Sequence, residues 1–486
     1  MDDRKAGGED VFALLRSVVD VLESSHTLTP SGAVVQYHDP LDLETLLDFK
    51  LGDETSADQL MDLISKTVKL SVRTSHPLFF NQLYGGTDPF GLAGAVVSEA
   101  LNTSAYTHEV APVFSLSERE VLKASLKLVG FDDGDGIFSP GGSISNMYGI
   151  VLSRFRRFPD SKKDGVYGLP TLVIYTSQDS HYSVTKGANW LGLGTSNVVK
   201  IESDARGKMI PSKLEEAIRN SISEGKIPLI VNCTSGTTVL GAFDPLEEIA
   251  KICEAHGIWM HVDGCWGGSL LLSKIHKKKL AGVEKADSVS WNPHKMLGAP
   301  LQCSLFLVKH KGLLKSCNMA GATYLFQPDK MYDPSYDSGD LSVQCGRKVD
   351  SFKLWTLWKY RGNCALGELV DHAVEMANYF LDTIRNRPGF KLVLDEFETT
   401  NVCFWFIPPR LRDCVETEDW WRQIHKVGPA LKKKLVESGD MMIGYQPLEH
   451  RNLKNFFRMV VTCHPPRTKS DMDSAVELIE KYGNQL

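Results

Sequence analysis

The sequence lacks the features that mark membrane, secreted and nucleic-acid-binding proteins. No apolar run approaches the roughly 20 residues that a helix needs to span a bilayer, and the first residues have no apolar core of a secretion signal. The 54 basic and 60 acidic side chains give a formal net charge of −6, too small and too mixed to indicate a nucleic-acid surface. We therefore expect a cytoplasmic chain that acts on a small molecule and binds neither a membrane nor a nucleic acid.

Cysteine pairs are also lacking. None of the ten cysteines precedes Cys233, and no two form the Cys-x-x-Cys spacing of zinc or dithiol sites. The pattern predicts reduced thiols and no metal site. Internal repeats, low-complexity tracts and proline-rich linkers are absent as well, so the domain boundaries depend on changes in the hydrophobic pattern.

At 486 residues the chain exceeds what one hydrophobic core normally serves. Helical spacing over residues 9–24 predicts an N-terminal helical segment, residues 1–95, that embraces a partner subunit. A large α/β domain is expected over residues 96–370. The pattern then changes to two long amphipathic helices around the strand-like residues 401–406, which predicts a smaller α+β domain over residues 371–486.

The clearest α/β pattern lies between residues 211 and 263. A helix is predicted with Ser212 as its N-cap, followed by a buried strand at 227–231. A second helix has Pro245 in its first turn and leads to a strand at 258–262. Such β-α-β units build a mostly parallel sheet, and open α/β sheets bind ligands at the carboxyl ends of their strands.

Polar and glycine-rich segments follow several of these strands. The loop Ser139-Pro-Gly-Gly-Ser-Ile-Ser-Asn leads into a helix whose free N–H groups can hold a phosphate, although such glycines also occur in plain tight turns. His181 lies in a loop after a strand, where a lone histidine is usually only a surface residue. The segments from Asn232 and from His261, the second containing Asp263, end two further strands. We expect these strand ends to converge.

A lysine completes the set. Most lysines are solvated charges, but Lys295 follows the strand at 288–291 in the turn Asn292-Pro-His-Lys. An aldehyde cofactor needs an amine to form its Schiff base, and a pyridine ring that accepts electrons needs a carboxylate beside its nitrogen. Phosphate loop, histidine, Asp263 and Lys295 are together the groups that a pyridoxal phosphate cofactor requires.

From residue 76 onward the chain resembles the group II pyridoxal decarboxylases of the glutamate decarboxylase and cysteine sulfinate decarboxylase kind. The motifs that carry this resemblance are Asp-Gly-Ile-Phe-Ser-Pro-Gly-Gly-Ser-Ile-Ser-Asn-Met-Tyr, Gly-Thr-Thr-Val-Leu-Gly-Ala-Phe-Asp-Pro-Leu, Asn-Pro-His-Lys and Tyr-Leu-Phe-Gln-Pro-Asp-Lys. The resemblance implies an α/β, aspartate aminotransferase-like fold of type I. It also implies pyridoxal 5'-phosphate as cofactor, and a homodimer in which a loop of one subunit reaches the active site of the other.

The resemblance further implies a role for each matched residue. Lys295 would form the Schiff base, Asp263 would pair with the pyridinium, His181 would stack on the ring, and Tyr324 would protonate the substrate carbon after carbon dioxide leaves. The expected cofactor contacts are Gly142, Ser143, His181, Thr234, Asp263, Cys265, Asn292, His294 and Lys295. The expected substrate contacts are Gln82, Tyr84, Ser104, Tyr106 and Arg458.

One position departs from the family pattern. The usual Asp-Ala-Ala-Trp is replaced by Asp263-Gly-Cys-Trp, which puts the thiol of Cys265 where a methyl group normally lies against the cofactor ring. A thiol is a small, modest hydrophobe, so the substitution is compatible with an unchanged function. The alternative is that a thiol so close to the aldehyde changes the reactivity of the cofactor.

Three positions bear on the substrate. Glutamate decarboxylases have a small residue, Asn and Phe where this chain has Tyr84, Ser104 and Tyr106; the cysteine sulfinate branch has Phe, Ser and Tyr. A bulky ring shortens the pocket, and hydroxyl groups can bind a short sulfinate or carboxylate. The sequence therefore predicts decarboxylation of cysteine sulfinate, cysteate or aspartate to hypotaurine, taurine or β-alanine.

Three other functions are compatible with part of the sequence. One is a glutamate decarboxylase that makes GABA, and another is a homologue that has lost its activity. A nucleotide-binding dehydrogenase is suggested only by Gly134-Asp-Gly136, whose glycine spacing is wrong for a dinucleotide fingerprint.

Overall fold

The computed structural model describes residues 7–29, 31–322, 324–327 and 329–486. The chain forms two compact units. One contains residues 1–86, 378–393 and 402–486, and the other contains residues 87–377 and 394–401. The expected division into residues 1–95, 96–370 and 371–486 stays a prediction.

The larger unit is built on a seven-stranded sheet with the strand order β2-β8-β7-β6-β5-β3-β4. Neighbouring strands are parallel from β7 to β4, whereas β8 is antiparallel to both β7 and β2. Its strands are β2 (Asp135–Phe138), β3 (Leu172–Ser177), β4 (Val198–Ile201), β5 (Ile227–Thr234), β6 (Trp259–Gly264), β7 (Ser288–Trp291) and β8 (Leu305–Val308).

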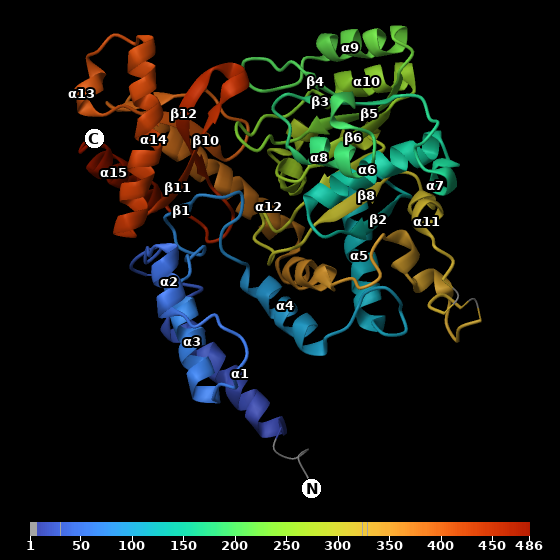
Figure 1. Ribbon diagram of the computed structural model, residues 1–486, viewed down its shortest axis with the longest axis horizontal. Coiled ribbons are helices and arrows are strands. Elements are labelled where there is room, and N and C mark those ends of the chain that lie inside the picture. The colour runs from blue at the N-terminus through green and yellow to red at the C-terminus, as the bar shows by residue number, and fades with distance from the viewer. Residues whose placement is uncertain (1–6, 30, 323, 328) are drawn as a thin grey trace. The chain divides into compact units, whose positions relative to one another are not determined.

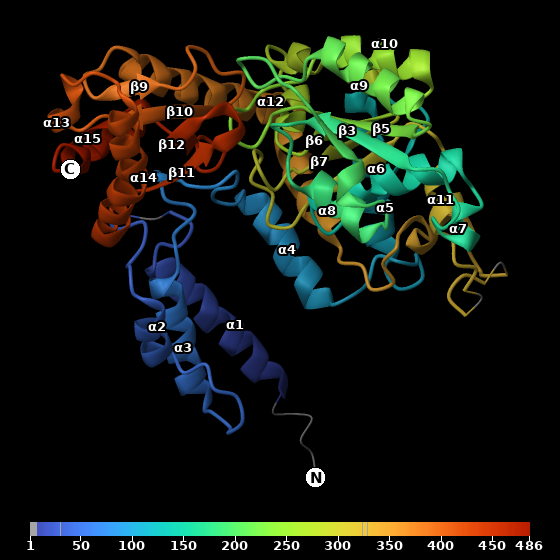
Figure 2. The ribbon, with the colours of Figure 1, turned by 45° about the horizontal axis from the view of Figure 1, so that its top comes forward.

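Helices cover both faces of this sheet, as Figures 1 and 2 show for α9 and α10 on one side and α6 and α8 on the other. The central strands β3, β6 and β7 are buried along their whole length, which is why they read as apolar runs without alternation. The helices of this unit are α4 (Pro89–Leu101), α5 (Pro112–Val129), α6 (Gly142–Arg157), α7 (Ser161–Asp164), α8 (Ser183–Trp190), α9 (Pro211–Ser223), α10 (Leu246–His256), α11 (Leu313–Asn318) and the first part of α12 (Asp350–Arg385). The predicted α/β class with a mostly parallel sheet is confirmed.

Two predicted helix starts are wrong. The N-cap of α9 is Ile210, with no side-chain hydrogen bond, and Ser212 lies inside the helix. Pro211 takes the first helical position instead, where its fixed φ fits and its missing N–H costs nothing. Pro245 is the N-cap of α10 rather than a residue of its first turn.

The smaller unit has a five-stranded sheet with the order β1-β11-β12-β10-β9. The short N-terminal strand β1 pairs in parallel with β11, so residues near 80 belong to the same sheet as the C-terminal region. Its strands are β1 (Phe79–Phe80), β9 (Phe390–Leu392), β10 (Asn401–Phe406), β11 (Met442–Leu448) and β12 (Leu453–Val460). Its helices are α1 (Gly7–Ser24), α2 (Pro40–Leu46), α3 (Ala57–Leu70), the last part of α12, α13 (Pro409–Arg412), α14 (Glu418–Ser438) and α15 (Lys469–Gly483).

None of the described helices combines the length and apolar character that a membrane span requires.

Three neighbouring strands of the large sheet bring the predicted residues to one edge. Thr234 at the end of β5 is paired with Asp263 of β6, and Gly264 is paired with Trp291 at the end of β7. Because these strands are parallel, the loops that follow them emerge at the same carboxyl edge. Helix α6 begins beside them after Gly141, whose φ of +97° is a conformation that glycine adopts readily.

Candidate active site

A cavity of about 250 Å³ lies at this carboxyl edge of the large sheet. All nine residues that were expected to contact the cofactor line it, although they come from five separate stretches of sequence. The lining residues are Gly142, Ser143, Asn146, His181, Tyr182, Thr234, Gly236, Thr238, Asp263, Cys265, Trp266, Asn292, His294 and Lys295. The predicted convergence of the strand ends is therefore present within the larger unit.

Asp263 is the buried carboxylate of the cavity. Its Oδ2 accepts a hydrogen bond from Asn146 Nδ2 at 2.8 Å, and its Oδ1 accepts one from the backbone N–H of Cys265 at 3.1 Å. Burial by itself would raise its pKa, but the charge of Lys295 and these hydrogen bonds together hold the pKa of Asp263 below its ordinary value. The carboxylate is thus held ionised in a buried place, as a partner of a protonated nitrogen must be.

Two histidines of the cavity are held neutral. Desolvation lowers the pKa of His181 against the opposing effect of Asp263, and the same cause lowers the pKa of His294 to about 4. His294 Nδ1 lies 2.7 Å from the carbonyl oxygen of Cys303. His181 Nδ1 accepts a hydrogen bond from the backbone N–H of Ser183, which fixes the ring at the start of α8.

The N-terminus of α6 forms a closely packed cradle. A Cβ atom added to Gly142 would lie 2.5 Å from Cys265 Sγ and 2.7 Å from Asn292 Nδ2, so a side chain at position 142 does not fit. The first N–H groups of a helix have no acceptor within the helix, and its N-terminus carries partial positive charge. This cradle suits a phosphate group.

Cys265 lies between this cradle and Asp263. Burial is the largest effect on the thiol and raises its pKa far above the ordinary value, so the group is protonated. The position therefore offers a small neutral side chain rather than a thiolate, which is compatible with the milder of the two expectations; the effect of Cys265 on the cofactor stays a prediction.

Two polar atoms in the lining have no hydrogen-bond partner in the described part of the chain. Thr234 Oγ1 and Asn292 Oδ1 are buried and make no hydrogen bond with any described residue. Buried polar atoms rarely stay unpaired in a folded protein, so two of them in one cavity are consistent with a polar ligand there. Together with a carboxylate, an amine and a phosphate cradle, these residues fit pyridoxal 5'-phosphate.

Asn146 and His261 were missed as site residues. Asn146 stands at the end of the glycine-rich motif, yet the motif gave no reason to expect that its amide would bind Asp263. His261 is fully buried, and its Nε2 lies 3.1 Å from Asn146 Oδ1. The alternation of His261 and Asp263 on one strand, which puts both on the same face, was the available signal.

The expected substrate residues Ser104 and Tyr106 belong to the larger unit but do not line the cavity. The hydroxyl of Ser104 is engaged by the backbone of Arg347, accepting from its N–H at 2.9 Å. The carbonyl oxygen of Tyr106 accepts a hydrogen bond from Gly339 at 2.8 Å. Both side chains are half-buried, and their contact with substrate stays a prediction.

The other expected substrate residues, Gln82, Tyr84 and Arg458, lie in the smaller unit. Arg458 is buried on β12, where desolvation lowers its pKa. Gln82 is exposed, and the ring of Tyr84 lies 6.5 Å from that of Phe79. Their roles likewise stay predictions.

Tyr324 lies in an irregular segment between α11 and α12, and 77% of its surface is exposed. Its carbonyl oxygen accepts a hydrogen bond from the side chain of Gln327. The preceding position 323 and position 328 of the same motif lie outside the described residues.

A carboxylate, a lysine and a phosphate cradle at the carboxyl edge of such a sheet define a pyridoxal phosphate enzyme. Comparison with known proteins agrees, because the pyridoxal-dependent decarboxylase conserved domain matches residues 40–407. The chain belongs to this family and is a pyridoxal-phosphate-dependent amino-acid decarboxylase.

Individual relatives match along nearly the whole chain. It is 49% identical over 488 residues to the acidic amino acid decarboxylase GADL1 of Mus musculus, covering 100% of this chain and 88% of that protein. Identity to the human cysteine sulfinic acid decarboxylase is 48%, covering 98% of this chain and 97% of the relative. The crystal structure of mouse CSAD superposes with a TM-score of 0.95 at 47% identity, covering 99% of this chain and 100% of that one.

Proposed function

We propose that the chain removes the α-carboxylate of a short acidic amino acid, namely cysteine sulfinate, cysteate or aspartate, as carbon dioxide. The products would be hypotaurine, taurine or β-alanine. The observation that carries the reaction type is the single cavity that unites Lys295, Asp263 and the α6 cradle. The substrate class is supported by relatives that are named for acidic amino acids and for cysteine sulfinic acid.

The residues of the cavity divide the task of holding the cofactor. Lys295 supplies the amine for the aldehyde carbon, Asp263 the carboxylate for the ring nitrogen, and Gly142 with its helix the phosphate site. When bound, pyridoxal phosphate supplies a ring that accepts the electron pair of the breaking bond. The low pKa of Asp263 keeps its carboxylate charged, so that it can hold a proton on the ring nitrogen.

Arg458 is the proposed partner of a substrate carboxylate. A guanidinium forms two parallel hydrogen bonds with a carboxylate, and burial strengthens such a pair because competing water is excluded. In the same unit Lys432 donates a 2.8 Å hydrogen bond to Asn81 Oδ1. Desolvation lowers the pKa of Lys432, and the charge of Arg458 lowers it further. Two neighbouring cations favour a substrate that carries two negative groups.

Tyr324 is proposed to donate the proton that replaces the carboxylate on the substrate carbon. Its phenol is exposed in the single chain, which is consistent with a residue that acts in the active site of a partner subunit. The proposed assembly is a homodimer, and the proposed location is the cytoplasm.

The experiment that tests the substrate is a product assay with purified holoenzyme and cysteine sulfinate, cysteate, aspartate or glutamate, each at equal concentration. Turnover of one or more of the three short acids, with glutamate the poorest, is the expected result. Preferential formation of GABA would replace the proposal by a glutamate decarboxylase. Absence of product from all four, despite an absorbance band that borohydride bleaches, would favour the inactive homologue.

A further inference from the structure

A second and larger cavity, of about 690 Å³, opens at the opposite edge of the large sheet. It is lined by the amino-terminal ends of β5 and β6, the residues just before β7 and the residue just after the antiparallel β8. Helix α10 and the last turn of α6 complete it. The 16 lining residues are Ser153, Arg156, Arg157, Pro228, Leu229, Ala250, Lys251, Cys253, Glu254, Gly257, Ile258, Trp259, Met260, Lys285, Asp287 and Lys309.

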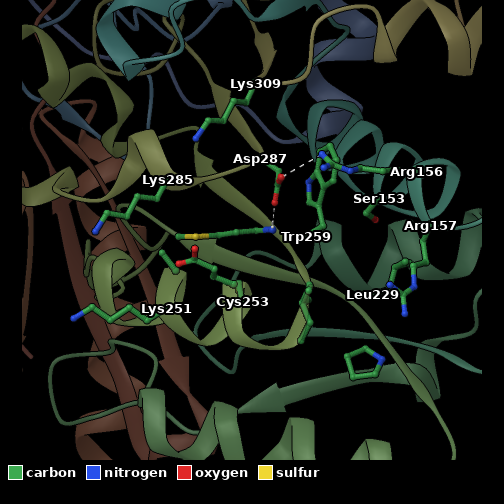
Figure 3. A pocket seen from close by; sticks show the side chains of 16 residues that line it. Ser153, Arg156, Arg157, Leu229, Lys251, Cys253, Trp259, Lys285, Asp287 and Lys309 are labelled. Carbon is green, nitrogen blue, oxygen red and sulfur yellow. Dashed lines mark hydrogen bonds and ion pairs between the residues drawn. The ribbon is translucent and has the colours of Figure 1, made fainter.

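The rim of this cavity is positively charged. Figure 3 shows Lys251, Lys285 and Lys309 on one side and Arg156 and Arg157 on the other. Glu254 and Asp287 are the only acidic residues of the lining, which leaves a formal excess of three positive charges. The whole chain has a net charge of −6, so this excess is local.

The carboxylate of Asp287 already has partners within the protein. Its Oδ2 accepts a hydrogen bond from the backbone N–H of Met260 at 2.8 Å, and its Oδ1 lies 2.6 Å from His310 Nε2 and 3.6 Å from Arg156 Nη1. Its charge is therefore partly balanced by Arg156.

Of the other four cations, two have a partner and two have no ion pair within the described part of the chain. Lys285 pairs at 3.9 Å with Glu247, and Lys309 donates to the carbonyl oxygen of Glu284. By contrast, Arg157 and Lys251 form no ion pair with any residue that the structure describes. They approach the cavity from different helices, α6 and α10, on the two faces of the sheet.

Ordinary structural roles explain part of this charge. Arginines in the last turn of α6 are favoured by the negative end of the helix dipole. That effect does not account for Lys251 in the middle of α10, nor for Lys285 and Lys309 in two separate loops. Like charges from four segments repel one another around a shared hollow, and a bound anion would relieve that repulsion.

The floor of the cavity is apolar. Leu229, Cys253, Ile258, Trp259 and Met260 are all buried there. Trp259 is fixed by a hydrogen bond from its Nε1 to Ser288 Oγ at 2.9 Å. Small-molecule sites commonly combine an apolar lining with a few polar or charged groups that orient the ligand, and this cavity has both.

We propose that this amino-edge cavity binds a small organic phosphate, with the flat ring of its organic part on the floor and its phosphate groups between Arg157 and Lys251. Phosphate is favoured because the planar guanidinium of arginine offers it two parallel donors, while a lysine adds a mobile point charge. The site is separate from the carboxyl-edge cavity. It does not depend on the proposed substrate.

Calorimetric titration of the holoenzyme with uridine triphosphate, without magnesium, tests the proposal. Bound pyridoxal phosphate occupies the α6 cradle, so that the probe cannot bind there. We expect saturable binding that weakens as salt is raised. Tripolyphosphate should bind at least about tenfold more weakly, because it has no organic part that can pack against the floor of the cavity. Uridine should not bind, because it lacks the negative charge of the phosphates.

The double variant Arg157→Glu and Lys251→Glu should weaken binding of uridine triphosphate at least about tenfold, since two attractive contacts become repulsive. The matched control is Lys163→Glu with Lys274→Glu, which changes net charge equally at exposed lysines outside the cavity lining. Because glutamate at position 157 opposes the α6 dipole, Arg157→Gln with Lys251→Gln is a milder second variant. Equal binding by the control and both cavity variants would overturn the proposal, as would no binding by the wild type.

Discussion

The amide of Asn146 joins Asp263 to a buried histidine. Asn146 Nδ2 donates to Asp263 Oδ2 at 2.8 Å, while its Oδ1 lies 3.1 Å from His261 Nε2. An amide oxygen can only accept, so His261 Nε2 carries the proton, and its Nδ1 accepts from Ser288 Oγ at 2.8 Å. This tautomer is neutral, in agreement with the lowered pKa of His261. The carboxylate that would face the cofactor is thus oriented by a second layer of residues.

Replacement of Asn146 by alanine should weaken catalysis without abolishing cofactor binding. The change leaves Asp263 and His261 each short of a partner in a buried place, which costs about 1–3 kcal/mol. We expect kcat/KM to fall roughly 5- to 150-fold and the pH dependence of the cofactor absorbance band to shift.

Ser183→Ala is the matched control, because Ser183 Oγ accepts the other Asn146 N–H at 3.0 Å but forms no hydrogen bond with Asp263 among the described residues. An equal loss in both variants, with no change in the pH dependence, would mean that Asn146 only supports packing.

Replacement of Lys295 by alanine should remove the amine that binds the cofactor covalently. Turnover should fall by roughly three orders of magnitude or more, and borohydride should no longer fix the cofactor to the protein. Product formation and absorbance before and after borohydride measure this. Retained decarboxylation by the variant would assign the amine to another lysine.

Replacement of Tyr324 by phenylalanine should separate the two halves of the reaction. Carbon dioxide release should partly persist, because the phenol is proposed to act only afterwards, as the proton donor. Without that donor the cofactor should be consumed by abortive transamination, so that activity decays during turnover unless pyridoxal phosphate is added. A variant that stays fully active through many turnovers would contradict this role.

Replacement of Arg458 by lysine should raise KM roughly tenfold or more for the best substrate, since a lysine cannot form the paired hydrogen bonds of a guanidinium. Steady-state kinetics measure the effect. Lys454→Arg, on the same strand β12, is the control and should leave KM unchanged. An unchanged KM in the Arg458 variant would remove this residue from the substrate site.

The buried His261 should make the protein sensitive to acid. Burial lowers its pKa to about 4, whereas an unfolded histidine titrates near roughly 6.5. The unfolded chain therefore binds the proton first, and stability that is present above pH ~6.5 is lost as the pH falls toward about 4.

The variant His261→Asn has no such group, so comparing it with the wild type cancels the contributions of other residues. The difference in free energy of unfolding between the two should shrink by up to about 3 kcal/mol from pH ~6.5 to ~4. Denaturant unfolding across this range measures it. A difference that stays constant with pH would show that His261 does not gain its proton on unfolding.

The sequence by itself determined the reaction class. Lys295, Asp263 and the glycine-rich start of α6 were found because each belongs to a short motif with its own chemical reason. The α/β class followed from helical and strand patterns that are local as well. Helix starts were less secure, since Ser212 and Pro211 both suit the beginning of a helix and the residues alone do not choose between them.

Only the tertiary structure decided which distant residues meet. Asn146 and Asp263 are 117 positions apart, and no local sequence pattern predicts a hydrogen bond between them. The antiparallel direction of β8 carries Lys309 to the amino edge of the sheet, where it joins Arg157 and Lys251 around the second cavity. Side chains with ordinary local environments acquire a joint function when the packing of strands and helices brings them together, and that packing depends on contacts across the whole unit.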